Sequence, residues 1–223
     1  MSTIAPPLPP RTPPAAIAPA VPAGPPVSGP LSEAHLRELA AADRRGAAIR
    51  RAGGVALFNG CAAATFAGGC LLWAIGSLLF GEWDVPGLVV GVGLAIAARN
   101  EFRGRRLLRR FEPRGPRLLG WNQIGLMVLV IGYCAYQVGV AVFGSNPYAE
   151  AIATEPMLAG SLGPLGDLYK TLAIAVYGAV AVGTALLQSL GAAYYFTRGR
   201  PMRAYLRETP DWVVRLRRHS MGA

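Results

Sequence analysis

The sequence of 223 residues predicts an all-α integral membrane protein, a four-transmembrane-helix bundle preceded by a disordered, Pro-rich N-terminal arm. Two observations lead to this prediction. Hydrophobic residues make up 52% of the chain and charged residues only 15%, against about 25% charged residues in an average soluble domain. The net charge is nevertheless +10, and the basic residues responsible for it fall in clusters separated by long apolar runs. This pattern is typical of a multi-span membrane protein.

Residues 1–30 form the predicted arm and hold 11 of the 19 prolines. Such a segment builds neither helix nor sheet, so we expect a disordered, partly polyproline II structure. It lacks the basic start and apolar core of a signal peptide. Pro6, Pro9 and Arg11 fit a PxxPxR ligand for SH3-like grooves. That motif arises readily by chance in a Pro-rich tract, and a flexible tail is the simpler interpretation.

Three spans follow from length and composition. Residues 53–81, 118–143 and 171–197 contain no charged side chain, and each run exceeds the roughly 20 residues that a helix needs to cross a bilayer. Before the first span, residues 31–52 predict a separate cytoplasmic juxtamembrane helix. Ser32 is its expected N-cap, and Glu33 suits its first turn.

A short second span is predicted at residues 85–100. Its apolar part, Val85–Ala98, would be only about 21 Å long as a helix, so an interfacial segment is the alternative. Charge bias favours crossing, because the three arginine clusters, at residues 11–51, 99–117 and 198–218, then lie on one side and supply 21 of the 22 basic residues. The positive-inside rule makes that side cytoplasmic. We therefore expect both termini to be cytoplasmic, in the plasma (inner) membrane.

The segments outside the predicted spans differ in charge between the two sides of the membrane. Residues 101–117 form an expected Arg-rich cytoplasmic loop, 144–170 an outer loop, and 198–223 a basic cytoplasmic tail. In the tail, Thr209 is the expected N-cap of an amphipathic helix whose apolar side carries Trp212, Val213 and Leu216. Basic amphipathic segments next to spans suit a surface of anionic lipid. The predicted lipid-headgroup contacts are Arg99, Arg103, Arg105, Arg106, Arg109, Arg110, Arg198 and Arg200.

Small residues recur at helical spacing in the spans and predict close helix packing. Packing within one chain is the favoured interpretation, and a dimer is the alternative. The predicted helix-packing positions are Gly60, Ala64, Gly68, Gly87, Gly91, Gly125, Gly132, Gly139 and Gly183.

An internal repeat of two helical hairpins is a further hypothesis. A shift of 63 residues lays the first span on the third, so that Asn59 meets Asn122. After the second and fourth spans come Phe102-Arg103-Gly104-Arg105 and Phe196-Thr197-Arg198-Gly199-Arg200. Chance matches between Gly-rich apolar runs are common, so the duplication stays a hypothesis.

No catalytic, metal or cofactor motif stands out in the sequence. Both histidines lie outside the spans, and Cys61, Cys70 and Cys134 lack metal-ligand spacing. Glu101, Glu112, Glu208 and Asp211 are scattered along the cytoplasmic side, and we expect them to be solvated. A candidate polar site in the cytoplasmic half of the spans, with interhelical hydrogen bonding as the favoured role, comprises Asn59, Asn122, Gln123 and Gln188.

The sequence favours a structural, accessory or assembly component over an enzyme. It would act through helix packing and through contacts with anionic lipids or proteins, as a homo-oligomer or in a larger membrane assembly. An oligomeric transporter or channel for a small solute is one alternative. An enzyme that acts on lipid headgroups is another. Nucleic acid is not an expected partner, because topology accounts for the arginines and no nucleic-acid module accompanies them.

Overall fold

The computed structural model describes residues 32–144, 153–155, 157 and 159–220, and this part of the chain is helical without strands. The predicted arm and residues 145–152 of the expected outer loop lie outside the described residues. Four of the helices are long and apolar enough to cross a membrane, as the sequence predicts. The long helices are α1 (Glu33–Leu79), α2 (Val85–Arg109), α3 (Arg114–Phe143) and α5 (Ala159–Thr197), and two short ones follow, α6 (Gly199–Glu208) and α7 (Asp211–Ser220).

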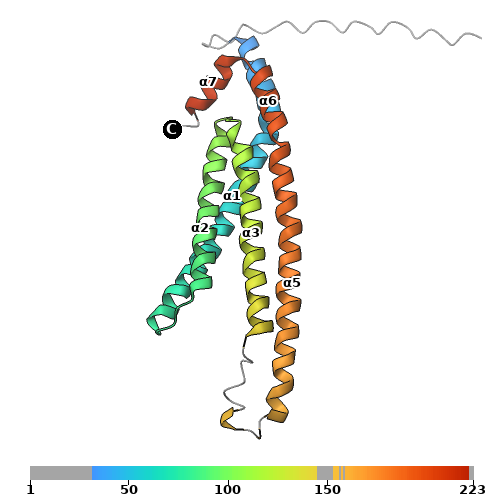
Figure 1. Cartoon of the computed structure of the whole chain (residues 1–223). Coiled ribbons are helices and arrows are strands. Elements are labelled where there is room, and N and C mark those ends of the chain that lie inside the picture. The colour runs from blue at the N-terminus through green and yellow to red at the C-terminus, as the bar shows by residue number, and fades with distance from the viewer. Residues whose placement is uncertain (1–31, 145–152, 156, 158, 221–223) are drawn as a thin grey trace, which may run out of the picture.

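The four long helices form two hairpins. Helix α1 packs along α2, and α3 packs along α5. Contacts between α2 and α3 hold the two hairpins together (Figure 1). Away from that contact the hairpins diverge, so the bundle is open at one end. The start of α1, the α2–α3 turn, α6 and α7 lie together at the other end. Described arginines of all three clusters therefore lie at this end, which we call the basic end.

Helix α1 runs without a break through the expected boundary between residues 52 and 53. It has 47 residues and a length of about 70 Å. Ser32 caps it as expected, because its side chain accepts from the backbone N–H of His35. Buried residues, all of them small except Ile49, continue across the boundary at intervals of three and four, which keeps one helix face against its neighbours. They are Ala42, Gly46, Ile49, Gly53, Ala56, Gly60, Ala63 and Ala67.

Helix α2 is longer than the expected second span. Its 25 residues include Arg103, Arg105, Arg106 and Arg109, which were expected in a loop at 101–117. Asp84 caps its start by accepting from the N–H of Gly87 at 2.9 Å. Only residues 110–113 connect α2 to α3. In this turn Phe111 has a φ of 54°, and its ring stacks on Tyr205 at 4.2 Å between centroids.

Helix α5 begins earlier than expected. It starts at Ala159 and includes Pro164, so the connection after α3 is shorter than the expected outer loop of residues 144–170. Only Arg198 separates α5 from α6. The basic tail therefore continues as two helices to Ser220.

The basic end contains the main hydrophobic core of the described residues. This core joins α1 to α6, α7 and the α2–α3 turn, and we call this packed unit the basic head. Large apolar side chains along the candidate spans are mostly exposed, as lipid-facing side chains would be. The core side chains are Ala42, Ile49, Ala52, Ala56, Leu108, Phe111, Leu119, Tyr195, Met202, Tyr205, Val213 and Val214.

The apolar side of α7 was expected to lie on the membrane surface, but most of it packs on the head core. Val213 and Val214 are buried in the head core, and the Trp212 indole donates to Glu38 at 3.0 Å. Only Leu216 remains exposed, at 49%. The helix starts at Asp211, and the hydroxyl of Thr209, the expected N-cap, is buried without a hydrogen bond to the described residues.

Candidate functional site

A buried carboxyl group lies where α1, α2 and α3 meet near the basic end. Glu101 of α2 is 0% exposed, so the expectation that it is solvated is wrong. It follows Ala97 by four residues and precedes Gly104 by three, which places it on the buried face of α2. Across from it, a Cβ built on Gly60 of α1 would lie only 3.1 Å from the Glu101 Cβ. The missing side chain at Gly60 therefore lets α1 approach the carboxyl group closely.

Two amides of α3 bind this carboxyl. The Glu101 Oε1 accepts from the Asn122 Nδ2 at 2.9 Å and from the Gln123 Nε2 at 2.7 Å. Asn122 also donates to the carbonyl of Ala97 at 3.1 Å and accepts from the Nδ2 of Asn100 at 3.2 Å. Because Asn122 and Gln123 are themselves buried, the network connects α2 to α3 in one register.

Two polar atoms of this region remain unpaired. The Glu101 Oε2 and the hydroxyl of Tyr195 are buried and have no hydrogen-bond partner among the described residues. Tyr195 of α5 is 0% exposed, and its hydroxyl lies close enough to the Glu101 carboxyl to interact with it electrostatically. Asn59 of α1 lies beside the same hydroxyl without forming a hydrogen bond to it. Burying such groups without partners costs about 1–3 kcal/mol each, so they mark a candidate site.

Most of the predicted polar site gathers here. Asn122 and Gln123 bind Glu101, and Asn59 adjoins Tyr195, whereas Gln188 lies half-buried about two helical turns away on α5. Glu101 was expected to be solvated because the predicted second span ends at residue 100. A helix extended past Arg99 would have placed Glu101 on the buried face. The burial of Tyr195 depends on how α5 meets α1, for which the sequence carries no signal.

The surroundings of Glu101 and Tyr195 can be compared with the hypothesis of an internal repeat. If Phe102 corresponds to Phe196, then the residue before each one, Glu101 or Tyr195, occupies an equivalent position. Asn122 of the second hairpin binds Glu101 of the first, and Asn59 of the first adjoins Tyr195 of the second. Two repeated hairpins related by a two-fold axis would produce these matched pairs. Only the first of these two contacts is a hydrogen bond, and the duplication stays a hypothesis.

Only some of the predicted helix-packing positions lie at close contacts between helices. A Cβ at Gly60 would lie 3.0 Å from the Phe102 ring, and one at Gly91 would lie 2.8 Å from Leu71. Gly87 adjoins the capping carboxylate of Asp84, and Ala64 is exposed. At the remaining positions a Cβ would meet no described atom within 4 Å, so no close approach between helices of this chain depends on them; they are Gly68, Gly125, Gly132, Gly139 and Gly183.

The predicted headgroup arginines lie on different surfaces. One row along α2 and its C-cap residue surrounds a recess of about 320 Å³ and consists of Arg99, Arg103, Arg106 and Arg110. Arg105 and Arg109 instead face α1, where they line a recess with Arg50. Arg198 stacks over the Tyr194 ring at 4.2 Å, and Arg200 is exposed on α6. Within the described part of the chain, none of these eight predicted arginines forms an ion pair.

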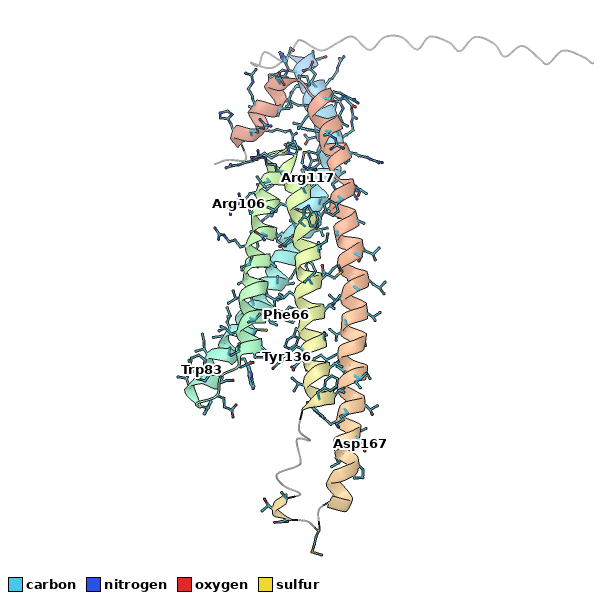
Figure 2. All side chains as sticks on the ribbon, viewed as in Figure 1. Phe66, Trp83, Arg106, Arg117, Tyr136 and Asp167 are labelled. Carbon is cyan, nitrogen blue, oxygen red and sulfur yellow. The ribbon has the colours of Figure 1, made fainter. Side chains whose placement is uncertain are left out.

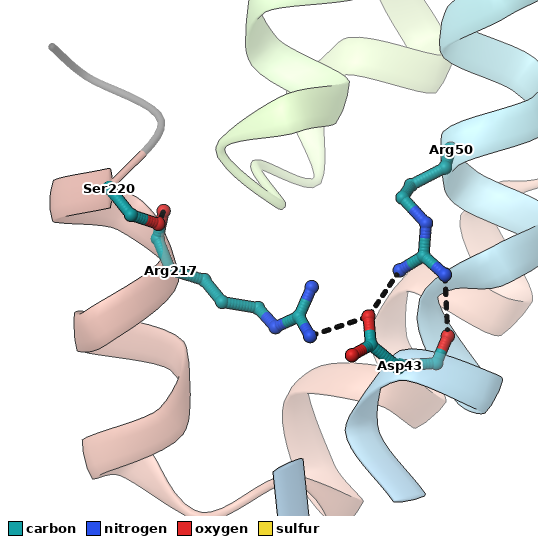
Figure 3. Close-up of polar contacts among 4 residues, drawn as sticks. All are labelled: Asp43, Arg50, Arg217 and Ser220. Carbon is teal, nitrogen blue, oxygen red and sulfur yellow. Dashed lines mark hydrogen bonds and ion pairs between the residues drawn. The ribbon is translucent and has the colours of Figure 1, made fainter. Parts of the chain in front are cut away.

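Other arginines hold the basic head together. Arg217 of α7 and Arg50 of α1 both pair with the Asp43 carboxylate (Figure 3), at 2.6 Å and 3.1 Å. The side chain of Arg217 is only 13% exposed, so this contact is more shielded than an ordinary surface ion pair. Arg45 donates to the backbone carbonyl of Glu208 at 2.8 Å. These contacts attach α6 and α7 to the first turns of α1.

No cluster of three potential metal ligands occurs among the described His, Cys, Asp and Glu residues. Cys61 is exposed, Cys70 is half-buried and Cys134 is buried, all as free thiols. No protein-family model, curated protein or solved structure matches the chain. Any proposal on function therefore depends on the buried carboxyl group, the arginine surfaces and the basic head.

Proposed function

We propose that the protein is a structural or assembly component of the plasma (inner) membrane, with both termini and the basic head in the cytoplasm. The observation that carries the proposal is the basic head itself. Its helices bury their apolar side chains in a shared core, which leaves arginines from all three clusters on a packed surface. Such a surface suits acidic protein partners and anionic lipid.

Charge reversal on the head surface tests this proposal. Arg200 and Arg203 are exposed on α6 and form no ion pair among the described residues. We expect the chain, extracted from its own membrane in mild detergent, to migrate as an assembly larger than the monomer. Arg200→Glu with Arg203→Glu should reduce it to the monomer, whereas Glu82→Gln at the opposite end should not. An unaltered chain that migrates as a monomer contradicts the proposal.

The buried Glu101 favours a second candidate, an oligomeric transporter of protons or small cations. Ionisable groups buried among membrane helices often serve such pathways, and repeat interfaces are common binding sites in transporters. In vesicles with a pH gradient, this candidate requires a chain-dependent flux that Glu101→Gln abolishes and Glu112→Gln retains. Absence of any flux would remove this candidate and leave the structural role in place.

A further inference from the structure

One face of α2 changes from aliphatic to basic along its length. Its residues follow one another at alternating intervals of four and three, which keeps them on one side of a helix. The four aliphatic side chains are 45–57% exposed, and the four arginines are exposed as well. In chain order the row is Val85, Val89, Val92, Ile96, Arg99, Arg103, Arg106 and Arg110.

Beside this row, a groove runs between α2 and α3. Its half near the α1–α2 turn is a recess of about 490 Å³ lined by aliphatic and tyrosine side chains. Its half near the basic end is a recess of about 340 Å³ that also includes Asn100 and Trp121. Leu129 lines both recesses, so they adjoin. Gly125 and Gly132 each line one recess, and the absence of side chains there keeps the groove open.

The groove leads to the arginine row. Ile96 and Asn100 line its inner half, and Arg99 and Arg103 follow these two residues by only three positions each. Figure 2 shows Arg106 at the same end of α2 and Trp83 at the opposite end. Because the four arginines form no ion pair among the described residues, their charges are available to an anionic ligand.

The dimensions of the groove fit one leaflet of a bilayer. Val89 and Arg99 are ten residues apart, or about 15 Å along the helix, which is half of a hydrocarbon core of about 30 Å. Guanidinium groups bind phosphate through paired hydrogen bonds. A second copy of the chain, related by a two-fold axis along the membrane normal, would bring two arginine rows together. Charge repulsion therefore favours an anionic ligand over a second copy.

We propose that the α2–α3 groove binds one anionic glycerophospholipid, with an acyl chain between the two helices and the phosphate on Arg99 and Arg103. The proposal deepens the anionic-lipid part of the proposed function and rests on its claim that the helices cross a membrane. Trp121, 65% exposed beside the groove, would lie at the headgroup level, where indole rings are favoured.

Native mass spectrometry of the full chain in mild detergent tests the headgroup contact. We expect dioleoyl phosphatidylglycerol to bind at one site and dioleoyl phosphatidylcholine to bind at least tenfold more weakly. Arg99→Gln with Arg103→Gln should weaken phosphatidylglycerol about tenfold or more. The matched pair Arg105→Gln with Arg109→Gln, on the face toward α1, should have less than a twofold effect. Equal effects of the two pairs would overturn the proposal in favour of diffuse attraction.

Filling the groove tests the acyl-chain contact. A Cβ at Gly125 or at Gly139 meets no described atom within 4 Å, but only Gly125 lines the groove. Gly125→Phe should therefore reduce phosphatidylglycerol binding at least fivefold, and Gly139→Phe on the same helix should not. Inorganic phosphate at the same concentration should not displace the lipid. Displacement by phosphate, or unchanged binding in Gly125→Phe, would overturn the proposal.

These outcomes are separable from those of the proposed function. A monomeric chain that binds phosphatidylglycerol in the groove would contradict the assembly role and retain the lipid site. A large assembly whose Arg99 and Gly125 variants bind lipid normally would do the reverse.

Discussion

At the scale of single residues, the most informative side chain is Glu101. Two buried amides satisfy its Oε1, whereas its Oε2 lacks a partner among the described residues. The amides depend on the carboxyl as much as it depends on them, because Asn122 and Gln123 are themselves buried. Removal of one amide would leave the remaining polar groups with unmet hydrogen bonds. The cost of substitution here should therefore depend on hydrogen bonding more than on volume.

Asn122→Leu tests this dependence. The substitution removes the donor to Glu101 and to the Ala97 carbonyl, so we expect the free energy of unfolding to fall by about 1–3 kcal/mol. Glu101→Gln keeps an acceptor oxygen for both amides and should cost less. Thermal unfolding in detergent, followed by circular dichroism, would measure both variants. A larger loss in Glu101→Gln than in Asn122→Leu would contradict this account of the network.

At the scale of helices, the sequence predicts the spans better than their ends. The four apolar runs are helical. However, α1 already begins at Glu33, before the expected start of the span at residue 53, and α2 ends at Arg109, past its expected end at residue 100. The predicted boundaries lie where charged residues begin, whereas a helix continues as long as its buried face does. An amphipathic basic segment is also ambiguous, since it can pack on lipid or on protein. Only the contact of α7 with α1 shows that Val213 faces the head core.

Two glycines of α1 test whether helix packing depends on close approach. A Cβ at Gly60 would lie 3.0 Å from the Phe102 ring, whereas one at Gly68 meets no described atom within 4 Å. Gly60→Leu should destabilise the fold by about 1–3 kcal/mol through overpacking. Gly68→Leu, two turns along the same helix, should be neutral or slightly stabilising. Equal melting temperatures for the two variants would show that α1 and α2 do not meet as described.

At the scale of the whole molecule, the arginines and the main hydrophobic core lie at the same end of the bundle. The arginine clusters at the start of α1, around the α2–α3 turn and in α6 and α7 lie at one end (Figure 1). The sequence predicts this common side from the positive-inside rule. It does not predict the basic head, because the head depends on contacts such as Arg217 with Asp43, which are 174 residues apart in sequence. Propensity and periodicity carry no information about such long-range pairs.

The central claim is that four helices cross the membrane and leave every arginine cluster in the cytoplasm. Sided thiol labelling tests it most directly, in a chain whose three cysteines are replaced by alanine. Trp83→Cys, in the α1–α2 turn, should react with an impermeant reagent added outside the cell. Arg106→Cys and Ser220→Cys should react only after the membrane is opened. Reaction of Trp83→Cys and Arg106→Cys from the same side would contradict the claim, because α2 would then not cross.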